Sequence, residues 1–197
     1  MRRLLVVLLL ASAFLGLQAQ DHTVTLSVSP ADAGTTSGGG TFATGTEVTV
    51  SASPAAGYQF VNWTESGVQV SATASYTFTI EADRALVANF SLLQYSISVS
   101  SSPEEGGSVT GGGTYDHGEQ VTITASPSAG YSFVNWTEDG SVISTNATYT
   151  FTVNSNRSFQ ANYSQNTYTV SVSNSPSSGG TATGGGNYNH GEQATIT

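Results

Sequence analysis

The amino-acid sequence predicts a mainly β fold, made of small β-rich repeat units that follow one another in tandem and contain antiparallel sheets. The first observation behind this prediction is that apolar residues alternate with polar ones at a period of two, which is the period of a strand. The second is that the pattern returns after a constant interval. Pro30, Pro103 and Pro176 are equally spaced, at a step of 73 positions, and no stretch has the spacing of an amphipathic helix.

The repeat has a constant length and aligns with itself without a gap. Residues 22–90 match 95–163 with 33 identical residues in 69 positions, which indicates duplication of one folding unit. The same step separates three glycine triplets, at 38–40, 111–113 and 184–186. We therefore expect two complete repeats, 22–90 and 95–163, and a truncated third, 168–197. The third copy stops inside its third expected strand, so we expect the chain to be a piece of a longer protein.

The first half of a unit is predicted to form two strands separated by turns, because apolar and polar residues alternate in both. In the first copy the opening strand covers 23–29, and Pro30 ends it because proline has a fixed φ and no N–H to donate to a sheet. The glycine triplet at 38–40 then provides the backbone freedom for a tight turn or a bulge. The next strand covers 48–52, where three apolar residues alternate with polar ones.

The second half of a unit contains the large aromatic residues. An aromatic strand at 58–63 is followed by Ser66 and Gly67, a pair typical of a hairpin turn. Further alternating strands cover 76–80 and 86–90, and the last one closes the unit. This gives five or six strands in each complete repeat.

The N-terminal segment, 1–19, has the three-part layout of a secretory signal peptide. Arg2 and Arg3 precede an apolar stretch at 4–17, and the small residue Ala19 stands just before the expected cut. A membrane anchor is the alternative, but a spanning helix needs roughly 20 apolar residues. We therefore predict a signal peptide at 1–19, a secreted or cell-surface location, and no membrane insertion after cleavage.

Charge and composition argue against several classes of protein. After cleavage, thirteen acidic residues face two arginines, which leaves a net charge of −11. Such a surface repels nucleic acid and anionic lipid. The chain has no cysteine, which excludes a disulfide scaffold, a zinc finger and a thiol enzyme. Disorder is the usual alternative for an acidic chain rich in glycine and serine, but regularly placed aromatic residues argue against it.

Two segments carry a resemblance to a known family. GYQFVNWT at 57–64 and DRALVANF at 83–90 recur as GYSFVNWT at 130–137 and NRSFQANY at 156–163. They are similar to the core and the closing strand of the divergent internalin-type B-repeat family, and the resemblance covers essentially all of 22–197. It implies an extracellular bacterial protein whose tandem units act as spacers or interaction modules. It also implies a fold that is β-grasp-like in the better known members, and no catalytic residues.

Trp63 and Trp136 occupy the same repeat position and are the first candidates for ligand contact. An exposed indole can stack on a sugar ring, as in carbohydrate-binding modules. Each tryptophan stands in a strand among Tyr, Phe and Val, however, and small domains need large apolar side chains in their cores. We expect both indoles to be buried, and we keep ligand contact as the alternative.

The histidines and the acidic pairs are candidates for a metal site. His117 and His190 share one repeat position, where the first copy has Thr44, and a turn entering a strand is a more common setting than a metal site. The acidic pairs at 104–105 and 138–139 lack the six to eight oxygen ligands of a calcium loop. We expect these pairs to lie in solvated turns, and we expect no metal and no cofactor.

Arg84 and Arg157 could bind an anion, but we expect each to pair with a nearby acid or to pack over an aromatic ring.

No nucleophile stands beside a base, so we predict no enzyme activity. The predicted role is that of an extracellular spacer, stalk or adhesive interaction module of a secreted or surface bacterial protein. The alternative is a carbohydrate-binding or accessory module of a larger secreted enzyme. The expected partners are neighbouring repeats in the same chain and a host or cell-surface protein or glycan.

Overall fold

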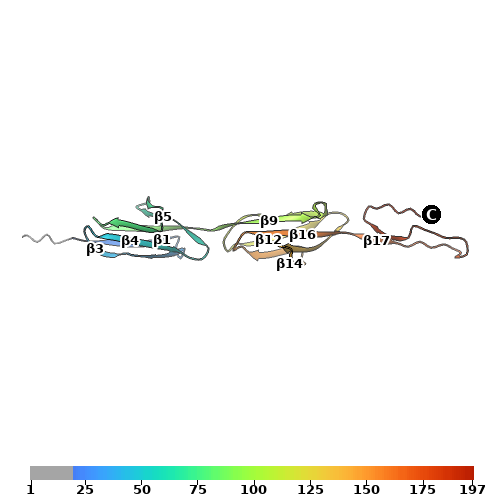
Figure 1. Cartoon of the computed structure of the whole chain (residues 1–197), viewed down its shortest axis with the longest axis horizontal. Coiled ribbons are helices and arrows are strands. Elements are labelled where there is room, and N and C mark those ends of the chain that lie inside the picture. The colour runs from blue at the N-terminus through green and yellow to red at the C-terminus, as the bar shows by residue number, and fades with distance from the viewer. Residues whose placement is uncertain (1–19) are drawn as a thin grey trace, which may run out of the picture. The chain divides into compact units, whose positions relative to one another are not determined.

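The computed structural model describes residues 20–197, and the predicted signal peptide lies outside the described residues. The chain divides into two compact units. The described part of the first runs from residue 20 to Ala55 and includes Phe60–Ser91, and the second consists of Ala56–Gln59 together with Leu92–Thr197 (Figure 1). No helix among residues 20–197 is long and apolar enough to cross a membrane.

The first repeat contains eight strands in two sheets. The strands are β1 (Asp21–Ser29), β2 (Gly34–Ser37), β3 (Gly40–Ala43), β4 (Glu47–Pro54), β5 (Tyr58–Glu65), β6 (Val68–Ser71), β7 (Ser75–Thr79) and β8 (Arg84–Leu92). A five-stranded sheet has the order β3-β1-β8-β5-β6, and a three-stranded sheet has the order β2-β4-β7. The first and last strands of the repeat are neighbours, because β1 pairs with β8 from Val24 opposite Arg84 to Ser29 opposite Asn89.

The second repeat has the same strand order. Its elements are β9 (Gln94–Ser102), a 3₁₀ turn (Glu104–Gly106), β10 (Gly107–Thr110), β11 (Gly113–Asp116), β12 (Gln120–Pro127), β13 (Tyr131–Glu138), β14 (Ser141–Ser144), β15 (Thr148–Thr152) and β16 (Arg157–Gln165). The sheets are β11-β9-β16-β13-β14 and β10-β12-β15. In the third copy, β17 (Thr167–Val170) and β18 (Gly186–Asn189) form a two-stranded antiparallel sheet.

The predicted β-rich class and the tandem repeats are confirmed, with two differences in detail. The five-stranded sheets are mixed, since β1 with β8 and β9 with β16 pair in parallel while the other registers resolved in these repeats are antiparallel. Each repeat also has more strands than expected, because the polar four-residue strands β2 and β3 have no alternating apolar pattern to reveal them. A β-grasp packs a helix on its sheet, whereas residues 20–197 contain only the 3₁₀ turn and no α-helix.

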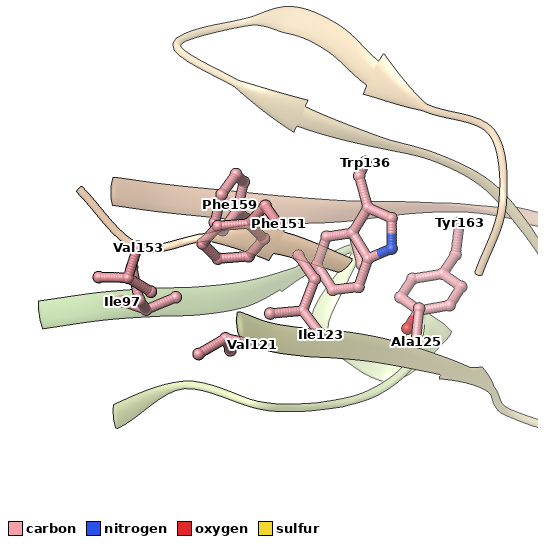
Figure 2. Close-up of a cluster of buried hydrophobic side chains, with 10 residues drawn as sticks. Ile97, Val121, Ile123, Ala125, Trp136, Phe151, Val153, Phe159 and Tyr163 are labelled. Atoms are coloured by element: carbon pink, nitrogen blue, oxygen red, sulfur yellow. The ribbon is translucent and has the colours of Figure 1, made fainter. Parts of the chain in front are cut away.

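The core of the second repeat lies between its two sheets. Figure 2 shows Trp136, Phe159 and Ile123 pointing into one cluster from different strands. The buried members of this cluster are Ile97, Val121, Ile123, Ala125, Trp136, Phe151, Val153, Phe159, Ala161 and Tyr163. They come from β9, β13 and β16 of one sheet and from β12, β15 and the segment after β15 of the other. The alternating residues of both sheets therefore build a sandwich core.

Candidate functional site

The two tryptophans are structural residues of the core. Trp63 and Trp136 are both 0% exposed, so the predicted burial is confirmed. Each indole Nε1–H donates a hydrogen bond of 3.1 Å to a backbone carbonyl, that of Ala74 in the first repeat and that of Ala147 in the second. The polar edge of each ring thus has a partner inside the protein. Neither ring is exposed at the surface of the structure, where a sugar could stack on it.

The arginine of the first repeat is held by an acid and by aromatic rings. Arg84 donates from Nη2 to Oε2 of Glu65 at 2.7 Å and from Nε to both carboxylate oxygens at 3.1 and 3.2 Å. Its guanidinium carbon lies 4.2 Å from the ring centre of Phe78, and Nη1 donates to the hydroxyl of Tyr76 at 3.3 Å. Hydrogen bonds from Arg84 hold the pKa of Glu65 below its ordinary value, although partial burial opposes this effect.

The second repeat has the same arrangement. Arg157 donates from Nη2 to Oε2 of Glu138 at 2.5 Å and from Nε to Oε1 at 2.8 Å. Its guanidinium carbon lies 4.9 and 4.7 Å from the ring centres of Phe151 and Phe159. The hydrogen bonds lower the pKa of Glu138 and raise the pKa of Arg157. The two predictions for the arginines, pairing with an acid and packing over an aromatic ring, are both confirmed.

The acidic pairs differ from each other. Glu104 and Glu105 are exposed in the 3₁₀ turn, as predicted for a solvated turn. Asp139 is exposed as well, with a φ of 48° in the tip of the β13–β14 hairpin. The prediction of a solvated turn is wrong for Glu138, which is partly buried because it ends β13 and pairs with Arg157. A signal for this pair was present, since both copies keep a glutamate 19 residues before the arginine.

A hollow lies beside this ion pair in the second repeat. Its volume is about 290 Å³, and polar side chains line it: Ser96, Ser98, Glu138, Asp139, Asn156, Arg157 and Ser158. Glu138 and Arg157 bond to each other, and the Oδ1 atom of Asn156 accepts a 2.8 Å hydrogen bond from the backbone N–H of Ser96. The ion pair and the Asn156 side chain are thus already used within the repeat.

The three histidines have different surroundings. Among residues 20–197, no group of three or more His, Asp or Glu side chains is placed to hold a metal ion. His22 lies 3.6 Å from Asp83, within one repeat. His117 is half-buried, and its Nδ1 atom is buried with no hydrogen-bond partner in the part of the chain that the structure describes.

The segments that match a known family coincide with these repeated sandwiches. Residues 24–94 and 97–167 each match the family model of the divergent InlB B-repeat domain. The chain belongs to this family. The starting points of the two B-repeat matches are separated by the step of the internal repeat, and each match runs from the first strand of a sandwich past its last. No curated protein matches the chain.

Proposed function

We propose that the chain is a non-enzymatic segment of a secreted or surface bacterial protein, in which the B-repeats act as a spacer, stalk or adhesive interaction module. The observation that carries this proposal is that two copies of one sandwich follow each other, and that both copies use their aromatic and cationic side chains internally. The indoles donate hydrogen bonds within their own repeat, at Trp63 and Trp136. The guanidinium groups form ion pairs within their own repeat, at Arg84 and Arg157. A spacer needs stable copies and no particular surface chemistry.

The exposed side chains of the complete repeats also support the spacer role. Their exposed large apolar residues are aliphatic: Val61, Val68, Leu92, Val134 and Val142. Flat aromatic rings are the side chains that stack on sugars, so this surface gives little support to a carbohydrate-binding module.

Small-angle X-ray scattering on chains with one, two and three complete repeats tests the spacer role. A spacer must lengthen with each copy, so the maximum dimension should rise nearly linearly, by about 30 Å for each repeat. A dimension that grows only with the cube root of the mass would contradict the spacer and favour a closed binding assembly. Binding to a polysaccharide array by a chain that does not lengthen would support the carbohydrate-binding alternative.

A further inference from the structure

Two glycine turns of this chain are each covered by a histidine that belongs to the following repeat in the sequence. Gly57 has a φ of +81°, and a Cβ atom placed on it would lie 2.6 Å from Cγ and 2.8 Å from Nε2 of His117. Gly130 has a φ of +80°, and a Cβ atom there would lie 2.9 Å from Cβ of His190. All four residues belong to the second compact unit. In both cases the histidine packs on a glycine of the preceding repeat.

Backbone hydrogen bonds hold each histidine beside its turn. The N–H of Leu93 donates to the carbonyl of Gly57 at 2.8 Å, and the N–H of His117 donates to the carbonyl of Leu93 at 2.8 Å. The same two bonds, at the same lengths, join Gly130, Asn166 and His190. The ring of His117 also lies beside Tyr95, with 6.0 Å between ring centres. The imidazole is therefore fixed by its own backbone and by a neighbouring ring.

The first repeat shows that the fold of a repeat does not require this histidine. Thr44 stands at the equivalent position, and its N–H and hydroxyl both donate to the carbonyl of Gln20, at 2.9 and 2.7 Å. The first repeat nevertheless has the same strand order as the second. His117 also buries an Nδ1 atom that lacks a hydrogen-bond partner among the described residues, which is unfavourable. The imidazole of His117 is thus not needed by its own repeat, and its contact with Gly57 is the role that remains for it.

We propose that His117 and His190 form a docking face by which a B-repeat binds the glycine turn of the repeat before it. The partner is another repeat of this kind, with a glycine at positive φ in the turn that precedes its aromatic strand. An imidazole can approach the backbone this closely only where no Cβ atom is present. The residue at this position therefore decides whether a repeat binds a preceding turn. This inference does not depend on the spacer role.

Hydrogen exchange on the full chain tests the docking face. His117→Thr introduces the residue that the first repeat already carries, so the second sandwich should keep its protected core amides. The amides of turn 56–59 and of Leu93 should exchange about tenfold faster or more, because the ring no longer covers the turn. Thr44→His is the matched control in the first repeat and should leave the exchange of the amides of turn 56–59 and of Leu93 unchanged. Unchanged exchange in the turn of the His117→Thr variant would overturn the proposal.

A pair of glycines separates the cost of backbone strain from the cost of the clash. Gly57 and Gly67 flank the same strand, β5, and have φ angles of +81° and +79°, but a Cβ atom on Gly67 meets nothing within 4 Å. Gly67→Ala should lower the midpoint of thermal unfolding by about 4–8 °C through strain alone. Gly57→Ala should lower it at least twice as much, and the excess should vanish in a His117→Ala background. Equal losses for the two glycines, or an excess that persists without the imidazole, would overturn the proposal.

Discussion

Replacing Trp136 tests whether the tryptophan holds the sandwich together. The indole is fully buried, and the carbonyl of Ala147 that accepts its N–H also accepts the backbone N–H of Ala125, at 2.9 Å. Trp136→Phe therefore leaves this carbonyl with a partner, and its cost comes from lost packing and from the small cavity that remains. Trp136→Ala empties the centre of the cluster that Figure 2 shows between the two sheets.

The expected magnitudes separate the two variants. A domain of about 70 residues has a free energy of unfolding of roughly 4–10 kcal/mol. Truncation of a buried Trp to Ala costs about 3–5 kcal/mol, so Trp136→Ala should remove roughly a third to all of the stability of the second repeat. Trp136→Phe removes a few non-hydrogen atoms and should cost about 1–2.5 kcal/mol. Val134, in the same strand but 45% exposed, is the matched control, and Val134→Ala should cost about 0.5 kcal/mol.

Urea titration with two probes measures these costs. Far-UV circular dichroism follows both repeats, while the fluorescence of Trp63 follows only the first repeat in either Trp136 variant. For Trp136→Ala we expect the dichroism of the second repeat to be lost at low urea while the Trp63 signal unfolds at its usual midpoint. If Trp136→Ala costs less than about 1 kcal/mol, as the surface control does, the indole is not the centre of the core and the reasoning fails.

Three other predictions concern burial, charge and the third copy. Emission from Trp63 and Trp136 should be blue-shifted and poorly quenched by iodide; a red-shifted, freely quenched signal that a polysaccharide protects would contradict their burial. Glu138→Gln should cost about 1 kcal/mol at pH 7. Because Arg157 lowers the pKa of Glu138, the stabilisation from this pair is complete above the ordinary value of about 4.3 and is lost as the pH falls through the lower folded pKa; urea midpoints from pH 7 to 3 should therefore fall less in the variant. Proteases should cleave 168–197 first, since that copy has one two-stranded sheet and no aromatic or closing strand to complete a core, and equal resistance along the chain would contradict this expectation.

The sequence was informative where side chains alternate and where glycine or tryptophan recurs. The aromatic strand and the burial of its tryptophan followed from residue type and spacing alone, because a large ring in an alternating strand faces the core. The same reasoning predicted that each arginine pairs with an acid or packs over a ring, but not which residues it meets. The parallel pairing of β1 with β8 could not be predicted in this way. These strands are the first and the last of the repeat, and no alternation within one strand tells which strand becomes its neighbour.

At the candidate sites, the features that were not predicted are contacts between residues that lie far apart in the sequence. Glu138 looked like part of a solvated turn because Asp139 and Gly140 follow it, yet it faces Arg157 on the neighbouring strand β16. His117 looked like an ordinary turn residue, and its relation to Gly57 depends on a contact with the repeat before its own. Both features were visible only as repeated spacings, and a spacing alone does not say which side chains meet.

The differences between the two copies show what the sandwich requires of its core. Val50 and Ile80 of the first repeat correspond to Ile123 and Val153 of the second, and all four are 0% exposed. One methylene group has thus moved from the second position of the pair to the first, and the total volume is unchanged. A core at close-packed density tolerates such an exchange, because the volume of the pair is conserved. Aliphatic residues at two core positions can therefore be exchanged together. The indole keeps its identity in both copies, because no second change can restore a buried ring of that size together with its hydrogen bond to a backbone carbonyl.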